Sequence, residues 1–194
     1  MNNFYRKKLL NSILYFAKNT KHSNTTKIFK LLNFFDFEHF CQTGYPSIGL
    51  EYYTFPKGPV PKELWYELKG GNVPNDFKKD LGINIKSRDE IDPNYIEYQF
   101  KAKHNPDLNV FTPREIQILE NLVLIYKNCT ASEISKISHE EEKPWLITKE
   151  KNGLYQPINY LLALKENSCI TKEQASEALA EHFEMFENFN IKPI

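Results

Sequence analysis

Apolar residues in the N-terminal part of the chain recur at helical spacing and predict two helices. The first helix carries one apolar stripe. The second begins at Thr25 or Thr26 and has further phenylalanines on its other sides. A helix that is apolar almost all round is usually buried on several sides, so we expect the second helix at the centre of the fold. The two stripes consist of Leu10, Ile13, Leu14 and Ala17, and of Ile28, Leu31, Leu32 and Phe35.

After Gly44 the pattern changes to β-forming residues and turns. Residues 50–55 predict a strand, and the proline-rich residues 55–61 predict a stiff loop, because each proline fixes a backbone angle and lacks an N–H donor. Pro61 suits the first turn of a short helix that contains Trp65. Strict alternation at residues 95–103 predicts a half-buried strand, whereas the polar residues 72–94 predict loop with a short extended piece at 83–85.

Three capping boxes predict helices in the rest of the chain. For the first of these helices, apolar spacing predicts an inner face made of Ile116, Leu119, Val123 and Tyr126. The last helix is acidic and amphipathic, and it is suited to pair with the basic first helix or to be offered to a partner. The fold class is therefore α+β, predominantly helical, with a central apolar helix surrounded by helices and a small antiparallel β-sheet. The boxes are Thr112 with Glu115, Thr130 with Glu133, and Thr171 with Gln174.

Charge is balanced overall and segregated along the chain. The 194 residues contain 25 basic and 25 acidic side chains, which argues against a protein that binds mainly by neutralising phosphates. Residues 1–35 hold seven basic and no acidic side chains, so the remainder holds 18 basic against 25 acidic ones. The helix predicted after Thr130 is acidic, which is the wrong sign for a DNA major groove. We expect no nucleic-acid binding through this domain.

The sequence offers neither a cofactor motif nor an assembled catalytic set. Its histidines lack metal-ligand spacing, and phosphate loops, dinucleotide glycines and nucleophile elbows are missing. Asp36 and His39 are neighbours on one helix face, which leaves a small hydrolase as an alternative, although a structural histidine is the commoner case. We expect no metal, no cofactor and no enzymatic activity. Three scattered cysteines, and the lack of a signal peptide or an apolar span, indicate a cytoplasmic protein with no membrane partner.

Several motifs in the same order resemble the Panacea domain, also called the SocA-like or DUF4065 family. Residues 27–64 contain its Lys-Leu-Leu-x-Phe-x-Asp helix, Thr-Gly turn, strand, Gly-Pro-Val-Pro loop and following helix. The helix after Phe111-Thr112 and the Ser-His-Glu and Pro-Trp pieces of residues 137–145 also resemble the family. The resemblance covers roughly residues 5–150. It implies a Panacea-like domain at 1–150 and a C-terminal helical extension at 151–194 packed on the same domain.

The matching positions and one departure bear on the site. Where the family often has Tyr-Gly-Pro, this chain has Lys57-Gly58-Pro59, which concerns the partner rather than the fold. The family-motif residues are Lys30, Asp36, His39, Gly44, Gly58, Pro59, Pro61, His139 and Trp145.

The resemblance implies an antitoxin of a bacterial or phage toxin–antitoxin pair that binds its cognate toxin directly. A second hypothesis is a proteolytic adaptor that delivers the toxin to a AAA+ protease. For toxin binding we predict a surface on the proline-rich segment, because a stiff, pre-organised segment loses little entropy on binding. The predicted residues are Tyr53, Phe55, Lys57, Pro59 and Trp65.

Overall fold

The computed structural model describes residues 3–71, 73–88, 96–140, 143–166 and 168–188. Its α-helices are α1 (Asn3–Asn19), α2 (Thr25–Thr43), α3 (Lys62–Leu68), α4 (Asn75–Asp80), α5 (Pro113–Tyr126), α6 (Ala131–Ser138), α7 (Pro144–Asn152) and α8 (Lys172–Asn188). The strands are β1 (Tyr52–Phe55), β2 (Gly58–Pro61), β3 (Leu81–Arg88) and β4 (Ile96–Ala102), and short 3-10 turns are η1 (Lys69–Gly71), η2 (Leu108–Val110) and η3 (Tyr160–Ala163). The predicted α+β, predominantly helical class is confirmed.

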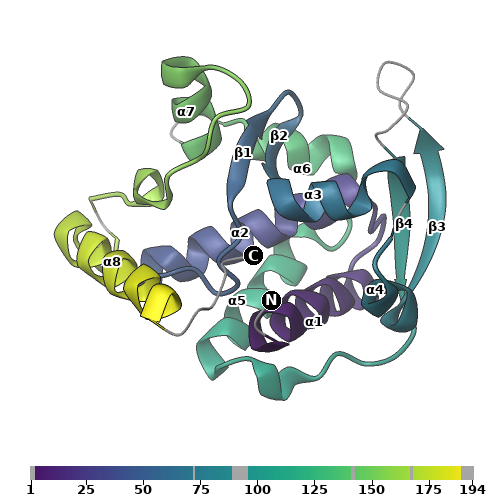
Figure 1. The fold of residues 1–194 in the computed structure, drawn as a ribbon. Helices are drawn as coiled ribbons and strands as arrows, with labels where there is room; N and C mark the ends of the chain where they lie inside the picture. Colours follow the sequence, from purple (N-terminus) through teal and green to yellow (C-terminus); the bar gives the residue numbers. More distant parts are fainter. Residues whose placement is uncertain (1–2, 72, 89–95, 141–142, 167, 189–194) are drawn as a thin grey trace.

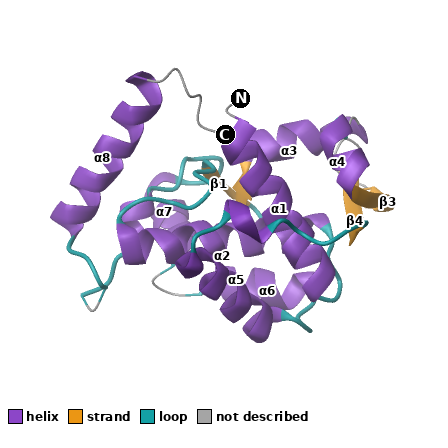
Figure 2. Ribbon diagram, turned by 90° about the horizontal axis from the view of Figure 1, so that it is seen from below, coloured by secondary structure: helices purple, strands orange, loops and turns teal. Residues whose placement is uncertain are grey.

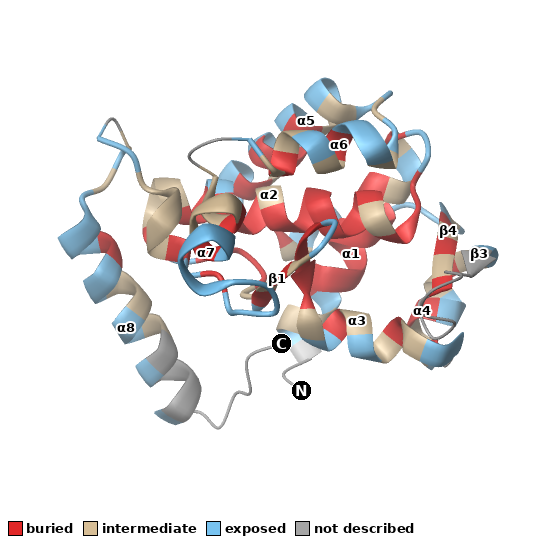
Figure 3. Cartoon of the chain, turned by 90° about the horizontal axis from the view of Figure 1, so that it is seen from above, coloured by how far each residue is buried: buried red, intermediate tan, exposed pale blue. Residues whose placement is uncertain are grey.

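Helix α2 is the centre of the molecule, as its sequence predicts. Most of its residues are buried, and α1, α5, α6 and the β1–β2 hairpin pack around it (Figures 1 and 3). Its N-cap is Asn24, whose side chain accepts the Lys27 N–H, and not Thr25 or Thr26. Gly44 ends the helix in the left-handed conformation that glycine adopts without strain.

The proline-rich segment is half of a hairpin and not the stiff loop that its composition predicts. β2 pairs antiparallel with β1, with Thr54 opposite Pro59 and Tyr52 opposite Pro61. The N–H of Thr54 donates to the Gln156 carbonyl, and the carbonyl oxygens of Thr54 and Tyr52 accept from the N–H groups of Tyr155 and Ile158. Both prolines therefore lie at pairing positions where β2 needs no N–H donor, which is where a strand tolerates proline.

The second hairpin confirms one predicted strand and corrects the region before it. In β4 the residues Ile96, Tyr98 and Phe100 are buried, as the alternation predicts. Residues 72–94 were predicted as loop with a short extended piece at 83–85. The extended piece lies within β3, which is longer than predicted and pairs antiparallel with β4, and the region also contains α4. Position 72 and residues 89–94 of this region lie outside the described residues.

The predicted inner face of α5 packs against the core, but the most deeply buried face of the helix overlaps with it only in part. Its capping box is confirmed, but Glu115, Ile118, Leu119 and Leu122 are buried, whereas Ile116, Val123 and Tyr126 are only half-buried. The buried carboxylate of Glu115 accepts hydrogen bonds from Lys8 Nζ at 2.7 Å and Ser47 Oγ at 2.5 Å. We attribute the burial of Glu115 to these polar partners. The spacing of hydrophobic residues cannot predict it, because that pattern does not include hydrogen bonds to distant side chains.

Two basic side chains of the N-terminal segment pair with carboxylates of α3, α4 and α5. Arg6 pairs with Glu67 and Asp76 at 2.7 and 2.6 Å, and Lys8 pairs with Glu115. Helix α8 instead packs chiefly against α2 and η3, at the side of the molecule away from β3 and β4 (Figure 2). Its described contact with α1 is the edge-on approach of the His182 and Tyr5 rings.

Candidate functional site

The acidic family-motif residue Asp36 fastens the chain that follows α2. Its carboxylate is fully buried and accepts the N–H groups of Ile48, Gly49 and Leu50 at 2.6, 3.3 and 3.3 Å. The hydroxyl of Tyr52 donates to the same carboxylate at 3.0 Å. Burial raises the pKa of Asp36 to about 6, and the four donors oppose that rise. Both carboxylate oxygens are thus used to position the start of the hairpin.

His39 lies one turn further along α2 and has a different set of neighbours. Its Nδ1 is 2.9 Å from the carbonyl oxygen of Tyr45, and its Nε2 is 3.9 Å from Glu115. Burial lowers the pKa of His39, while the Tyr45 carbonyl opposes the shift. The side chain is almost completely buried, and the hydrogen-bond partners of Asp36 and His39 are different residues. This geometry argues against the hydrolase alternative, because neither group is presented to a substrate.

Lys30 is a buried amine that holds β2 against α2. Its Nζ donates to the carbonyl oxygen of Pro59 at 2.8 Å, and burial lowers its pKa to about 7. Gly58 makes the close approach possible: at a φ of 103°, a Cβ here would lie 2.8 Å from Lys30 Cε and from His139 Nε2. The lysine therefore fixes the inner side of the hairpin.

His139 and Trp145 fix the same hairpin from α6 and α7. Their rings stack at 4.0 Å between centroids, and Trp145 Nε1 donates to the carbonyl oxygen of Phe55 at 3.1 Å. Burial lowers the pKa of His139, and the nearby charge of Lys30 adds to that effect. The Ser-His and Pro-Trp pieces of the family pattern thus meet at the β1–β2 turn.

The remaining family-motif residues define the ends of elements. A Cβ on Gly44 would lie 2.7 Å from Cβ of Ala178, so this glycine lets α8 approach α2. Pro61 is the residue directly before α3. A structural role accounts for the positions of the family-motif residues, except that Nε2 of His139 is buried and has no hydrogen-bond partner among the described residues.

The outer side of the hairpin carries a cluster of exposed and half-exposed aromatic rings, which we call the aromatic face. Phe55 lies at its centre, 5.4 Å from the Trp65 ring and 5.1 Å from the Tyr155 ring. Tyr66 and Tyr155 are 52% and 59% exposed. Lys62 and Lys69 place ammonium groups over the rings of Tyr53 and Trp65. The aromatic face consists of Tyr53, Phe55, Trp65, Tyr66 and Tyr155.

The structure brings together three of the five predicted toxin-binding residues. Tyr53, Phe55 and Trp65 belong to the aromatic face, and Lys57 is exposed at the hairpin turn. Pro59 is buried and pairs with Thr54, so it lies on the inner side. Sequence analysis missed Tyr66 and Tyr155. Tyr66 adjoins Trp65 in the predicted helix, whereas Tyr155 reaches the site only because residues 155–158 line the β1 edge.

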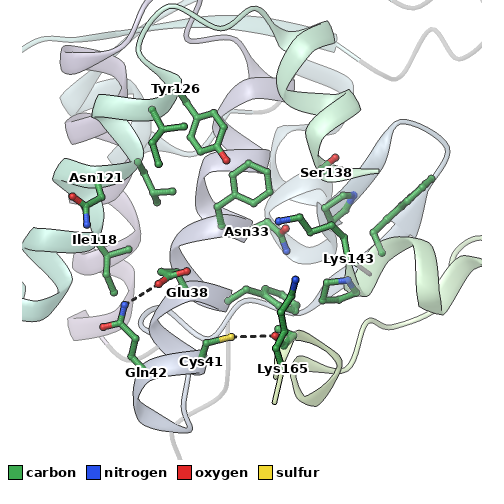
Figure 4. Close-up of a pocket in the computed structure, with 18 of the residues that line it drawn as sticks. Asn33, Glu38, Cys41, Gln42, Ile118, Asn121, Tyr126, Ser138, Lys143 and Lys165 are labelled. Atoms are coloured by element: carbon green, nitrogen blue, oxygen red, sulfur yellow. Dashed lines mark hydrogen bonds between the residues drawn. The ribbon is translucent and has the colours of Figure 1, made fainter. Parts of the chain in front are cut away.

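A second surface is a groove along one side of α2. It has a volume of about 710 Å³ and is lined by residues of α2, α5, α6, α7 and β2 and of the segment around η3 (Figure 4). Leu124 and Ile125 at its α5 side are 81% and 62% exposed. Within it, Cys41 donates to the Ala163 carbonyl, and burial raises the pKa of this thiol to about 11. We call this feature the α2 groove; its lining includes Asn33, Phe34, Phe37, Glu38, Gln42, Ile125, Tyr126, Lys143, Trp145 and Lys165.

The part of the chain that the structure describes shows neither a metal-binding arrangement nor a membrane-spanning helix. There, no group of three or more His, Cys, Asp or Glu side chains is arranged to hold a metal ion. None of the described helices combines the length and apolar character that crossing a membrane requires.

Comparison with known proteins identifies the domain. Searches of curated proteins and of solved structures found no match. The model of the family described as "Antitoxin SocA-like, Panacea domain" matches residues 28–146, from the start of α2 to the beginning of α7. Since this match spans more than half of the chain, the protein belongs to the SocA-like antitoxin family with the Panacea domain, which supports an antitoxin role in general.

Proposed function

We propose that this protein neutralises a cognate toxin by binding it directly, and that the aromatic face is the primary contact. The observation that carries this proposal is the exposure of a contiguous aromatic cluster beside lysine side chains. Aromatic residues are enriched in the energetically dominant parts of protein interfaces, and surrounding charges favour encounter with a partner of opposite sign.

The aromatic face is also held rigidly, which supports a binding role. Lys30 fixes Pro59, Trp145 fixes Phe55, and the Tyr155 N–H donates to the Thr54 carbonyl at 2.6 Å. A surface ordered before binding loses less conformational entropy when the complex forms, so more of the contact energy contributes to affinity. The same fastening accounts for the burial of the family-motif residues beneath the hairpin.

The experiment begins with the reading frames that flank the gene. Each is expressed alone and together with this protein, and the complex is then sought by co-purification and calorimetry. We expect one neighbour to stop growth, growth to return on co-expression, and the two purified proteins to form a complex. A toxic neighbour that remains equally toxic with this protein, or that never binds it, would refute the proposal.

Variants test the location of the contact. Phe55→Ala and Trp65→Ala should each weaken toxin binding by about tenfold or more, because they remove central aromatic contacts. Phe4→Ala is the matched control, since Phe4 is an exposed aromatic residue of α1, outside the aromatic face. Equal affinity of all three variants and the wild type would place the contact elsewhere while leaving direct binding intact.

A proteolytic adaptor is the second candidate, and the presence of two separate surfaces favours it. An adaptor must hold a toxin and a AAA+ protease at once, and the α2 groove is distinct from the aromatic face. This candidate predicts that the half-life of the toxin falls when the protein is supplied. If the toxin is equally long-lived in both conditions, sequestration is sufficient and the adaptor candidate is excluded.

A further inference from the structure

Tyr155 has a backbone conformation that tyrosine rarely adopts. Its φ is 62°, in the left-handed region, where Cβ comes close to the following carbonyl oxygen. Among the described residues, His22, with a φ of 57°, is the other non-glycine residue in this region. Gly153, two positions before Tyr155, has a φ of 89°, which glycine adopts without strain. A tyrosine at position 155 therefore destabilises the fold relative to a glycine there.

The hydrogen bonds of this segment do not depend on the tyrosine side chain. The Tyr155 N–H donates to the Thr54 carbonyl at 2.6 Å, and the Thr54 N–H donates to the Gln156 carbonyl at 2.9 Å. The Thr54 hydroxyl donates to the Gly153 carbonyl and accepts from the Gln156 N–H, each at 2.9 Å. Residues 153–156 use only main-chain atoms in these bonds, so a glycine at position 155 would keep all of them.

The Tyr155 ring is presented to solvent rather than to the core. The residue is 59% exposed, and its described ring contact is the edge-on approach to Phe55 at 5.1 Å. Phe55 also has the Trp65 ring as a neighbour at 5.4 Å, so it keeps one aromatic partner without Tyr155. Packing within the fold does not explain why a strained position holds a tyrosine. Strained residues concentrate at binding and active sites, where the function of the site offsets the strain.

The segment around Tyr155 leaves no main-chain donor for an added strand. Pro157 lacks an N–H, and the N–H groups of residues 155, 156 and 158 all donate to atoms of β1. A partner that binds by strand addition needs free N–H and C=O groups along an exposed edge. A partner therefore meets this edge of the hairpin through side chains, and the Tyr155 ring is the most exposed aromatic side chain of the aromatic face.

We propose that residues 153–158 are part of the toxin-binding surface, and that Tyr155 contacts the toxin from its strained backbone position. This inference rests on the proposed function and deepens it. Residues 153–158 follow the part of the chain that the family model matches, residues 28–146. The C-terminal extension thus adds one ring to the four that the matched domain supplies. A ring on an ordered backbone is an effective contact, because little entropy is lost on binding.

Tyr155→Gly tests whether the tyrosine serves binding rather than folding. Glycine removes both the strain and the ring, so we expect the melting temperature to fall by no more than about 2 °C, or to rise. Calorimetry with the purified toxin should show affinity weakened by about tenfold. Tyr155→Phe keeps the ring and should retain most of the affinity. His22→Gly is the matched control, because His22 is exposed, has a similar φ and lies outside the aromatic face; its affinity should equal that of the wild type.

Photo-crosslinking is a second measurement that does not depend on the glycine variant. A benzophenone amino acid is placed at position 155, where it keeps an aromatic ring, or at position 22 as the control. Each full-length protein is mixed with the purified toxin, irradiated and digested, and the joined peptides are sequenced by mass spectrometry. We expect position 155 to capture one toxin segment and position 22 to capture none.

The outcomes separate this inference from the proposed function. If Phe55→Ala weakens toxin binding but Tyr155→Gly does not, the inference is overturned and direct neutralisation stands. If Tyr155→Gly lowers both affinity and the melting temperature, by about 5 °C or more, the crosslink decides, and a toxin that position 155 does not capture overturns the inference. If no neighbouring protein binds the wild type, the proposed function itself fails, and this inference fails with it.

Discussion

The two sides of the β1–β2 hairpin differ in what their residues contact. On the inner side, Gly58 and Pro59 meet the buried side chain of Lys30 and the half-buried side chain of His139. On the outer side, Phe55 packs among rings that are partly open to solvent. The inner side fits one arrangement of neighbours closely, whereas the outer side has neighbours on one side and solvent on the other.

This difference explains how the family pattern relates to partner choice. The family-motif residues that match in this chain are buried or end an element, so they define the domain. Lys57, where the family often has tyrosine, is exposed at the turn. We infer that residues which define the domain and residues which select the toxin lie back to back on one hairpin. The predictions that follow separate the two sets.

The largest effect should come from Asp36→Ala on the inner side. The substitution leaves three N–H groups, two of them buried, and the Tyr52 hydroxyl without their acceptor. We expect the free energy of unfolding to fall by about 3 kcal/mol or more, measured by urea denaturation. Glu38→Ala, an exposed position of the same helix, should change it by less than about 0.5 kcal/mol. Equal stabilities of the two variants would contradict the structural role of Asp36.

Gly58→Ala should have the next largest effect. Its backbone has a φ of 103°, and the added methyl group would lie 2.7 Å from Ser138 Oγ. We expect a loss of about 2–3 kcal/mol, from backbone strain together with overpacking. Gly70→Ala measures the effect of backbone strain alone, because Gly70 also has a positive φ but has no atom within 4 Å of the added carbon. This variant should lower the free energy of unfolding by about 1 kcal/mol. If both variants lose the same stability, the contact with Lys30 and His139 is not tight.

The pH dependence of stability should identify Lys30 as a buried amine. Its pKa in the folded protein is about 7, below the ordinary value of 10.5, so between these pH values the unfolded chain binds a proton that the folded one does not. The stability of the wild type should therefore rise with pH in this range relative to Lys30→Met, by at most about 1.4 kcal/mol per pH unit. Urea denaturation of both proteins at pH 7, 8 and 9 measures the difference.

The other titratable groups are present in both proteins, so their contributions to the pH dependence of stability should cancel when wild type and Lys30→Met are compared. The nearby His139 has a lowered pKa and is neutral throughout the range, so it adds no slope of its own. Parallel curves for wild type and Lys30→Met would show that the amine is solvated, and that the inner side of the hairpin is looser than its geometry indicates.

Sequence patterns predicted what depends on local spacing and missed what depends on distant partners. The buried α2, the alternation in β4 and the capping boxes of α5 and α6 are local features, and all were found. The inner face of α5 was predicted only in part, because Glu115 is buried against Lys8, more than a hundred positions away. Local patterns could not place Tyr155 beside Phe55, because Tyr155 reaches the aromatic face through hydrogen bonds to β1. Proline-rich β2 was taken for a loop because only its pairing register shows that the prolines need no donors.

The smallest effect should come from Lys57→Glu on the outer side. Lys57 is exposed at the turn, near the aromatic face, so charge reversal should slow association with the toxin several-fold at low salt and leave dissociation and stability almost unchanged. The difference in association rate should shrink as salt is added, because exposed charges are screened. Stopped-flow mixing at two ionic strengths measures both rates, and Lys57→Gln should fall between the wild type and the reversal. A change confined to dissociation would mean that Lys57 is buried within the complex, and the turn would then belong to the central contact together with Phe55.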